Sequence, residues 1–214
     1  MTEPPRILVV DHRDSFVFIL AEQFLRFGAT VETYRSDLSV GELERRVAEF
    51  DPDLVVLSPG PGHPREATTT LAWLERDSTR PVLGVCLGHQ AIGLVSGAKV
   101  ERGAAPVHGR AGLVTLGDDP LLAGLRDPFP AARYHSLIVR DLPSELAAIA
   151  WLEEDGEEVV MAMRRIDRPW IGLQFHPESF LTPGGSELLA RILREALERR
   201  GRSSEVASWQ TSRS

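Results

Sequence analysis

The sequence has little cysteine and little lysine, and both shortages exclude kinds of chemistry. Its 214 residues include one cysteine, Cys86, and one lysine, Lys99. A single cysteine excludes an internal disulfide and a cysteine-based zinc cluster, and it fits a reducing compartment. A single lysine leaves little for a phosphate-binding loop or for Schiff-base catalysis. We therefore expect a cytoplasmic protein.

Long apolar runs and an excess of basic charge are missing as well. No apolar run approaches the roughly 20 residues of a membrane span, and the sequence does not start with the basic and apolar regions of a signal peptide. The net charge of -7 at pH 7 argues against a nucleic-acid partner. With 43% hydrophobic and 26% charged residues, the composition predicts a soluble globular protein that binds neither membrane nor nucleic acid.

The chain up to Val95 alternates between strand-like and helix-like patterns. Apolar runs predict strands at 7–10, 31–34, 54–57 and 81–85. Such alternation predicts parallel strands with right-handed crossovers, hence an open α/β sheet flanked by helices. Ligands bind such sheets beyond the carboxyl ends of the strands. The expected helices begin at Asp14 or Ser15, at the capping box of Ser39 and Glu42, at Pro64, and after Gly88.

From Lys99 onward, short strand patterns alternate with turn signals such as Asp155-Gly156. This change predicts a mainly antiparallel portion added to the parallel sheet. A helix from Gly185 to Arg200 follows, and Gly201 ends it. We expect one domain over 1–201 and a disordered tail over 202–214. The strands expected in the antiparallel portion are 112–116, 136–139, 147–151, 159–163 and 170–175.

The stretch Gly84-x-Cys86-x-Gly88 has the pattern of a nucleophile elbow between a strand and a helix. An apex residue held in a strained conformation leaves room only for glycine beside it. The helix N-terminus would favour the Cys86 thiolate, and the N–H of Leu87 would face an oxyanion formed there. A lone cysteine in an apolar stretch is also commonly a small buried hydrophobe, so the elbow alone leaves both interpretations open.

A cysteine nucleophile needs a base, and the base needs an orienting acceptor. Among the six histidines, His176 directly follows the strand pattern that ends at Phe175 and precedes Pro177. Residues i and i+2 of an extended segment share a face, so Glu178 could accept from the His176 imidazole. The competing interpretation is a solvated polar turn. The histidine spacing of a metal site is absent from the sequence, so we expect no metal ligands.

The segment Ser58-Pro59-Gly60-Pro61-Gly62 follows the third predicted strand. Proline and glycine form turns, so a simple tight turn is one interpretation. The other is a rigid loop whose glycine backbone approaches a substrate and supplies a second oxyanion donor. Its position at the same sheet edge as Cys86 favours the second interpretation.

Together these motifs resemble the class I, triad-type glutamine amidotransferases, which have a flavodoxin-like core. Within that class the sequence is most similar to the small glutaminase subunits of anthranilate synthase and aminodeoxychorismate synthase. One position departs from the pattern, because the first motif usually reads D-N-x-D-S-F and His12 occupies the asparagine place. The matching segments are VVDHRDSF (9–16), LSPGPGHP (57–64), GVCLGHQ (84–90), PVHGR (106–110), ARYHSLIV (132–139) and QFHPES (174–179).

The resemblance implies a role for each matching residue. Cys86 attacks the carboxamide of L-glutamine, His176 transfers the proton, and Glu178 orients His176, through a γ-glutamyl thioester. The resemblance implies no cofactor in this chain. The positions that it implies for the oxyanion hole and for glutamine binding are Gly60, Pro61, Gly62, Leu87, Gln90, Ser136 and Leu137.

The resemblance also implies a partner. We see no further domain that could use the ammonia, so we expect a heteromer with a chorismate-binding synthase subunit, for tryptophan or folate biosynthesis. Two other functions stay open at this stage. One is a stand-alone cysteine γ-glutamyl hydrolase, and the other is a non-catalytic regulatory subunit that keeps the fold.

Overall fold

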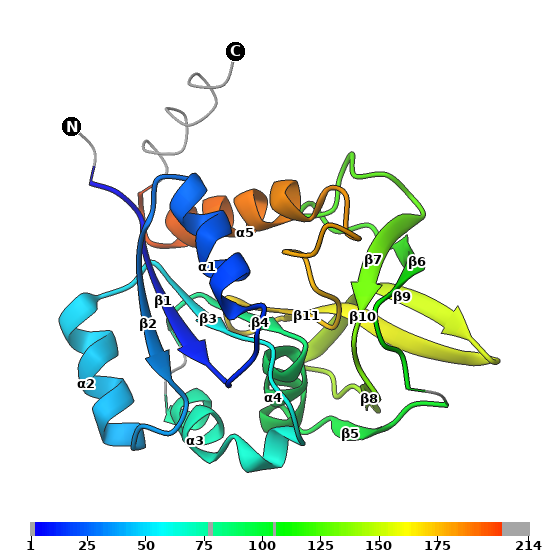
Figure 1. Cartoon of the computed structure of the whole chain (residues 1–214), viewed down its shortest axis with the longest axis horizontal. Helices are drawn as coiled ribbons and strands as arrows, with labels where there is room; N and C mark the ends of the chain where they lie inside the picture. The colour runs from blue at the N-terminus through cyan, green and yellow to red at the C-terminus, as the bar shows by residue number, and fades with distance from the viewer. Residues whose placement is uncertain (1–2, 77–78, 105, 203–214) are drawn as a thin grey trace.

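The main sheet changes from parallel to antiparallel pairing along its width (Figure 1). A computed structural model describes residues 3–76, 79–104 and 106–202. Over these residues the predicted architecture, an open parallel sheet flanked by helices with an added antiparallel portion, is confirmed. In sheet order, the nine strands are β2 (Thr30–Arg35), β1 (Arg6–Asp11), β3 (Leu54–Leu57), β4 (Val82–Val85), β11 (Trp170–Leu173), β10 (Glu157–Arg165), β9 (Leu146–Glu154), β6 (Arg110–Leu116) and β7 (Phe129–Arg133).

The parallel half runs from β2 to β11, and each neighbouring pair in it is parallel. The strands β3, β4 and β11 are buried along their whole length. This is expected for parallel strands that helices cover on both faces. Their sequences therefore read as unbroken apolar runs rather than as alternating patterns.

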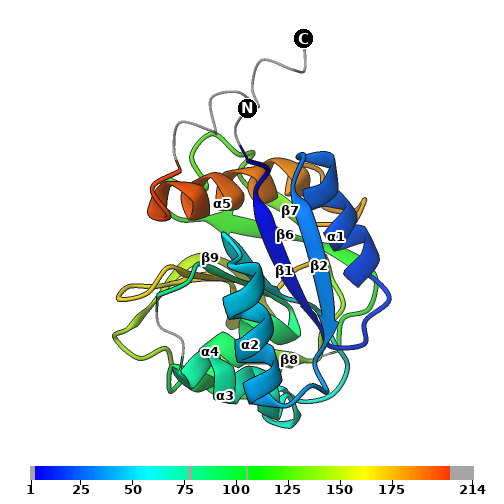
Figure 2. The same cartoon turned by 90° about the vertical axis from the view of Figure 1, so that its left-hand side faces the viewer.

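Helices cover both faces of the parallel half, as Figure 2 shows. One face carries α1 (Val17–Arg26) and α5 (Gly185–Arg199), and the other carries α2 (Val40–Phe50), α3 (Thr68–Arg76) and α4 (Leu87–Val95). Successive side chains of a strand point to opposite faces, so β1 contributes to both cores. Ile7 and Val9 join the first core, and Leu8 and Val10 join the second.

Within the described ranges, no helix is both long and apolar enough to span a bilayer.

The remaining strands extend the sheet from β11 with antiparallel pairing. The predicted Asp155-Gly156 turn joins β9 to β10, with φ values of 52° and 77°. Two positive φ values suit a tight hairpin, because they match the twist of the flanking strands. Outside the main sheet, β5 (Lys99–Arg102) pairs with β8 (Leu137–Arg140). All five strands predicted for this portion are present, with ends shifted by up to three residues.

The sequence did not predict β5 and β7. β5 contains one buried residue, Val100, between charged neighbours, so it lacks an apolar run. β7 contains Pro130 and two alanines, which are poor strand formers. β5 pairs with the distant β8 and β7 pairs with β6 across a 12-residue connection, 117–128. A local apolar pattern reveals neither pairing.

Three predicted helix starts were wrong in detail, and one of them is that of α4, which begins at Leu87 and not after Gly88. Pro64 begins a separate 3-10 turn, Pro64–Glu66, before α3 starts at Thr68. α1 starts after Phe16, whose N–H donates to the Asp14 carboxylate at 2.7 Å. The capping box of α2 is half formed, because the Ser39 hydroxyl accepts from the N–H of Glu42 at 3.2 Å while the Glu42 carboxylate binds arginines. The predicted single domain stays a prediction, and residues 203–214 of the predicted tail lie outside the described residues.

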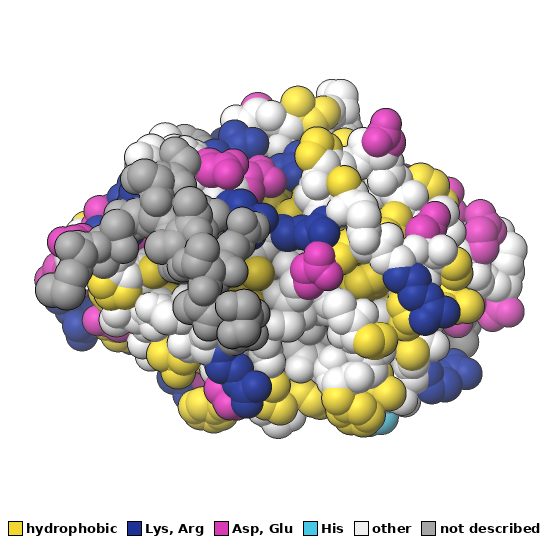
Figure 3. All heavy atoms as spheres, turned by 90° about the horizontal axis from the view of Figure 1, so that it is seen from above, with side chains coloured by type: hydrophobic (Ala, Val, Ile, Leu, Met, Phe, Trp, Pro, Cys, Tyr) yellow, Lys and Arg dark blue, Asp and Glu magenta, His cyan; other side chains and the backbone are white. Residues whose placement is uncertain are grey.

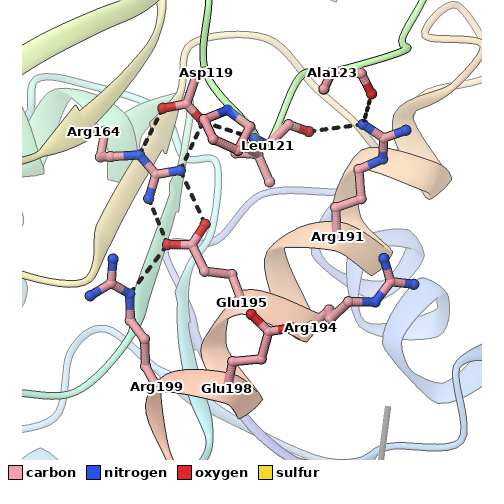
Figure 4. Close-up of a pocket in the computed structure, with 10 residues that line it drawn as sticks. Asp119, Leu121, Ala123, Arg164, Arg191, Arg194, Glu195, Glu198 and Arg199 are labelled. Atoms are coloured by element: carbon pink, nitrogen blue, oxygen red, sulfur yellow. Dashed lines mark hydrogen bonds and ion pairs between the residues drawn. The ribbon is translucent and has the colours of Figure 1, made fainter. Parts of the chain in front are cut away.

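Arginine ion pairs connect α5 with the antiparallel portion of the sheet (Figure 4). They lie at an open groove of about 940 Å³. Arg164 on β10 donates to Asp119 at 3.0 Å and to Glu195 on α5 at 2.6 Å. Arg191 on α5 donates to the Leu121 carbonyl. On the face seen in Figure 3, basic and acidic side chains lie next to each other. None of the predicted site residues lines this groove, so we assign it a structural role.

Glycines allow β3, β4 and α4 to approach each other closely at the turn after β4. A Cβ added at Gly88 would collide with the carbonyl oxygen of Leu57, and one added at Gly84 would collide with the backbone of Gly88. In both cases the obstacle is backbone, which moves only if whole elements shift. The turn after β4 therefore requires glycine at both positions.

We predict that Gly88→Ala lowers the free energy of unfolding by about 1–3 kcal/mol, because the Leu57 backbone must move. Gly41→Ala is the matched control, since Gly41 lies exposed on α2 and a Cβ there meets nothing within 4 Å. Alanine there should stabilise the helix by about 0.5–1 kcal/mol. Urea denaturation measures both, and equal midpoints for the two variants would contradict the close approach described above.

Candidate active site

Cys86 occupies the sharp turn between β4 and α4. Its backbone φ of 51° and ψ of -99° lie outside the conformations that non-glycine residues favour. Its N–H donates to the Leu173 carbonyl of β11 at 2.8 Å, which holds the strained turn against the neighbouring strand. The residue is 7% exposed. Strain of this kind is typical of functional positions, and the sulfur is placed at the N-terminus of α4.

His176 and Glu178 form a buried pair just beyond the carboxyl end of β11. Nδ1 of His176 lies 2.6 Å from Oε1 of Glu178. The N–H of His176 donates to the Ala132 carbonyl at 3.0 Å, and the Thr182 hydroxyl donates to the His176 carbonyl at 2.7 Å. Backbone bonds therefore hold the His176 main chain in place, and Glu178 orients the ring through Nδ1.

The environment of His176 favours its charged form. Burial opposes protonation, but the Cys86 sulfur and the Glu178 carboxylate outweigh it and raise the pKa of His176 to about 10. The other ring nitrogen, Nε2, is buried and forms no hydrogen bond with the residues that the structure describes. The geometry thus leaves Nε2 available to a substrate group, while Cys86 and Glu178 both act on the ring.

Two aromatic rings enclose the His176 imidazole. The ring centroids of Phe16 and Tyr134 lie 5.3 Å and 5.0 Å from that of His176, both in edge-on arrangements. Phe16 and Tyr134 also contact each other, with 5.2 Å between their centroids. This packing keeps water from the imidazole, so the charges of Cys86 and Glu178 act on it through a medium of low polarity.

The segment 58–62 lies beside Cys86 through its glycine. A Cβ at Gly60 would come within 2.5 Å of the His12 Cβ and 2.7 Å of Cδ2 of Leu87, the residue that follows Cys86. The structure thus brings Gly60 and Leu87 together. Pro61 and Gly62 lie on the exposed part of the loop, and a Cβ at Gly62 would meet only the Glu66 side chain.

A chain of buried amides runs from the predicted glutamine-binding residues to the sulfur. Nε2 of Gln90 donates to the Leu137 carbonyl at 3.1 Å and to Oε1 of Gln174 at 3.3 Å. Nε2 of Gln174 donates in turn to the Cys86 sulfur at 3.8 Å. Leu137 is connected with Cys86 in this way. Ser136 is exposed, and its carbonyl accepts from the N–H of Gly103.

Three residues that connect with the site, Gln174, Arg133 and His135, carry no sequence signal of their own. Nδ1 of His135 donates to the Leu137 carbonyl at 3.1 Å, and its Nε2 accepts from Arg133 at 3.2 Å. Burial and the Arg133 charge lower the pKa of His135 to about 4, so the ring is neutral. Arg133 is held by a two-pronged ion pair with Glu154, at 3.0 Å and 2.7 Å. All three missed residues lie inside segments that the motif comparison already contained.

No metal site is evident in the part of the chain that the structure describes. Over residues 3–76, 79–104 and 106–202, no group of three or more histidine, cysteine, aspartate or glutamate side chains is placed to hold a metal ion. The groups that the structure does bring together at the site are a thiol, an imidazole and a carboxylate.

Several known proteins resemble this chain over most of its length. The family described as Glutamine amidotransferase class-I matches residues 8–196. Anthranilate synthase component 2 of Thermus thermophilus is 42% identical over 191 residues, which cover 89% of this chain and 92% of that protein. The protein named anthranilate synthase component 2, pyocyanine specific, of Pseudomonas aeruginosa is 42% identical over 190 residues, covering 88% and 92%.

A solved structure shows the same fold at lower identity. It is that of a protein described as a GMP synthase subunit, from Thermoplasma acidophilum, with a TM-score of 0.82 and 22% identity. The match covers 95% of this chain and 100% of that one. At this identity the likeness extends to the fold alone.

We predict that Glu178→Gln lowers the pKa of His176, because the amide keeps an acceptor for Nδ1 but removes the negative charge. Cys86→Ala should lower the pKa as well, since the sulfur contributes in the same direction. NMR titration of the imidazole measures the shift. The matched control is Glu153→Gln, an exposed carboxylate on β9. A pKa of His176 that stays unchanged in both variants would contradict the charge pairing.

Proposed function

The chain belongs to the class I glutamine amidotransferase family, and from this premise we propose that it is the glutaminase subunit of a chorismate-aminating synthase. We propose anthranilate synthase first and aminodeoxychorismate synthase next. The two relatives at 42% identity are both named anthranilate synthase component 2, which supports the first choice. One of these two names adds "pyocyanine specific" and the other does not. Similarity at this level therefore does not tell for which pathway the aminated product is made.

The proposed reaction begins with attack of the Cys86 sulfur on the side-chain carboxamide carbon of L-glutamine. A carbon–sulfur bond forms, the carbonyl oxygen takes up negative charge, and the carbon–nitrogen bond then breaks. His176 gives its proton to the departing nitrogen, which leaves as ammonia, and a γ-glutamyl thioester remains. Water, deprotonated by His176, attacks the thioester and releases glutamate and the thiol.

One observation carries this proposal, namely a strained Cys86 at the same buried site as a His176 imidazole that Glu178 binds at 2.6 Å. The pKa of His176 is raised to about 10, so the imidazole can donate a proton to the departing nitrogen. Because Glu178 binds Nδ1, the nitrogen that remains to donate the proton is Nε2, on the opposite side of the ring.

The oxyanion would be held by backbone N–H groups of Leu87 and of the 58–62 loop. Gly60 is the position that supports this, because its backbone lies against Leu87. Gln90, Ser136 and Leu137 would hold the α-amino and α-carboxylate groups of glutamine, and Pro61 and Gly62 would shape the loop. We propose that the reaction needs no cofactor or metal in this chain, since the nucleophile, the base and the donors are all protein groups.

A partner subunit would use the ammonia. Ammonia becomes ammonium in neutral water and then does not attack, so release next to the acceptor site is required. Two exposed aromatic side chains lie close in sequence to residues of the site. Phe180, two residues after Glu178, is 89% exposed, and Phe18, two residues after Phe16, is 74% exposed. Exposed aromatic residues are typical of protein interfaces, so both suit a synthase subunit that covers this edge.

We predict that Cys86→Ala abolishes glutamine-dependent amination while the complex still uses added ammonium salts at alkaline pH. The reason is that the triad only generates ammonia and the partner performs the amination. Steady-state assays with each nitrogen source measure the two activities. Loss of the ammonium-driven reaction together with the glutamine-driven one would contradict this division of labour. Normal glutamine use by the variant would exclude Cys86 as the nucleophile.

We also predict that the isolated chain hydrolyses glutamine slowly and becomes faster with its synthase partner, and faster again when chorismate is present. Lowering the barrier by about 1.4 kcal/mol raises the rate tenfold, and one oxyanion hydrogen bond can supply that much. A small change in the 58–62 loop would therefore suffice to increase the glutaminase rate. Glutaminase kinetics of the chain alone, with partner, and with partner plus chorismate test this. An equal kcat/KM in all three conditions would favour a stand-alone hydrolase, and no activity in any would favour a regulatory subunit.

A further inference from the structure

His12 is the residue that departs from the asparagine of the first motif, and it is enclosed by the end of β1, the 58–62 loop and α3. It is 5% exposed, and its partners Ser58 and Thr70 are both 0% exposed. Nδ1 of His12 lies 3.2 Å from the carbonyl oxygen of Ser58 and 3.3 Å from its hydroxyl oxygen. Nε2 lies 2.8 Å from the Thr70 hydroxyl oxygen. Both ring nitrogens are thus engaged, one with the loop and one with the helix.

The surrounding bonds determine which nitrogen carries the hydrogen. The Ser58 hydroxyl donates its only hydrogen to the Pro59 carbonyl at 2.6 Å, and it accepts from the backbone N–H of His12 at 2.9 Å. Both oxygens near Nδ1 are therefore acceptors, so Nδ1 must be the donor. Nε2 then has a lone pair, which accepts from the Thr70 hydroxyl.

This arrangement requires a neutral ring, and the site provides one. Burial lowers the pKa of His12 to about 4, although the Ser58 carbonyl and the Asp11 charge act in the opposite direction. At neutral pH the ring therefore has one donor and one acceptor, which match its two partners. An asparagine side chain has polar atoms at the depth of Nδ1 but none at the depth of Nε2. It could bind Ser58 but could not reach Thr70.

The 58–62 loop also rests on His12 directly. A Cβ at Gly60 would lie 2.5 Å from the His12 Cβ and 2.9 Å from its carbonyl oxygen. The same Cβ would lie 2.7 Å from Cδ2 of Leu87, the residue after Cys86. Gly60 thus packs against both His12 and Leu87, so a shift of His12 would disturb the loop at the residue next to the nucleophile.

We propose that His12 is a positioning residue, which connects the 58–62 loop to Thr70 on α3 and so keeps the Gly60 backbone oriented toward an oxyanion at Cys86. The inference rests on the proposed glutaminase function. His12 touches neither substrate nor sulfur in this role, and it acts through Ser58 and Gly60. Because an oxyanion exists only in the transition state, weakening this connection should lower kcat and leave KM nearly unchanged.

A double-mutant cycle with Thr70→Val and His12→Asn tests the connection in the complex of the chain with its synthase partner. Each single change removes the bond between Nε2 and the Thr70 hydroxyl. We expect each to lower kcat for glutamine by about tenfold, equivalent to one hydrogen bond worth roughly 1.4 kcal/mol, with KM within about twofold. In the His12→Asn background, Thr70→Val should change kcat by less than about twofold, because the bond is already gone.

Three controls separate positioning from general damage. Thr70→Ser keeps the hydroxyl and should retain kcat. Thr69→Val removes the neighbouring hydroxyl, which donates to the Leu38 carbonyl, and should leave kcat unchanged. The ammonium-driven activity of the complex should be the same in every variant. Nitrogen NMR of the imidazole should show hydrogen on Nδ1 of His12 in the unmodified chain.

The outcomes also separate this inference from the proposed function. If the unmodified chain has glutaminase activity that depends on Cys86, but kcat is unaffected by Thr70→Val or the two changes are additive, the role of His12 is overturned and the function stands. A hydrogen on Nε2 of His12 would overturn it too. If Thr70→Val fails to fold, the cycle is repeated with Thr70→Ala at reduced temperature, and the same additivity criterion decides.

Discussion

The contact between Gly88 and the Leu57 carbonyl is the constraint on which the site depends. It exists because neither Gly88 nor Gly84 has a Cβ, so α4 begins closer to β3 and β4 than any other residue would allow. Cys86 lies between the two glycines and takes up the remaining strain in its own backbone. A strained turn of this kind persists only where the surroundings over-determine it. Here the surroundings are the two strands on either side of β4.

The pairing of β4 with β11 carries the constraint from the nucleophile to the base. The two strands are parallel neighbours, and the bond from the Cys86 N–H to the Leu173 carbonyl continues their ladder by one residue. His176 follows three residues later and is fixed to Ala132 of β7. The base is therefore placed by two strand contacts, one parallel and one antiparallel. The antiparallel portion thus belongs to the site, because it positions one side of the imidazole.

The sequence could predict the parts of this arrangement that depend on local pattern. Apolar runs revealed β3, β4 and β11, and the spacing of Gly84, Cys86 and Gly88 revealed the turn. Contacts between distant segments could not be predicted in the same way. The chain of Gln90, Gln174 and the Cys86 sulfur depends on α4 and β11 lying side by side, and Arg133 binds Glu154 only because β7 and β9 share a sheet through β6. β7 itself was missed because Pro130 and its alanines give no strand pattern, although its carbonyl at Ala132 holds the base.

The histidines of the site show how one side-chain type serves opposite roles. Burial lowers the pKa of His12 and His135 to about 4, and that of His89, a fully buried residue of α4, to about 3. At His176, Cys86 and Glu178 overcome burial and raise the pKa to about 10. The positive charge on His176 contributes to keeping His135 neutral. Near neutral pH, these four rings therefore carry one positive charge, and it lies where a thiolate can pair with it. The neutral rings of His12 and His135 bind backbone carbonyls and a hydroxyl without adding a second positive charge to the site.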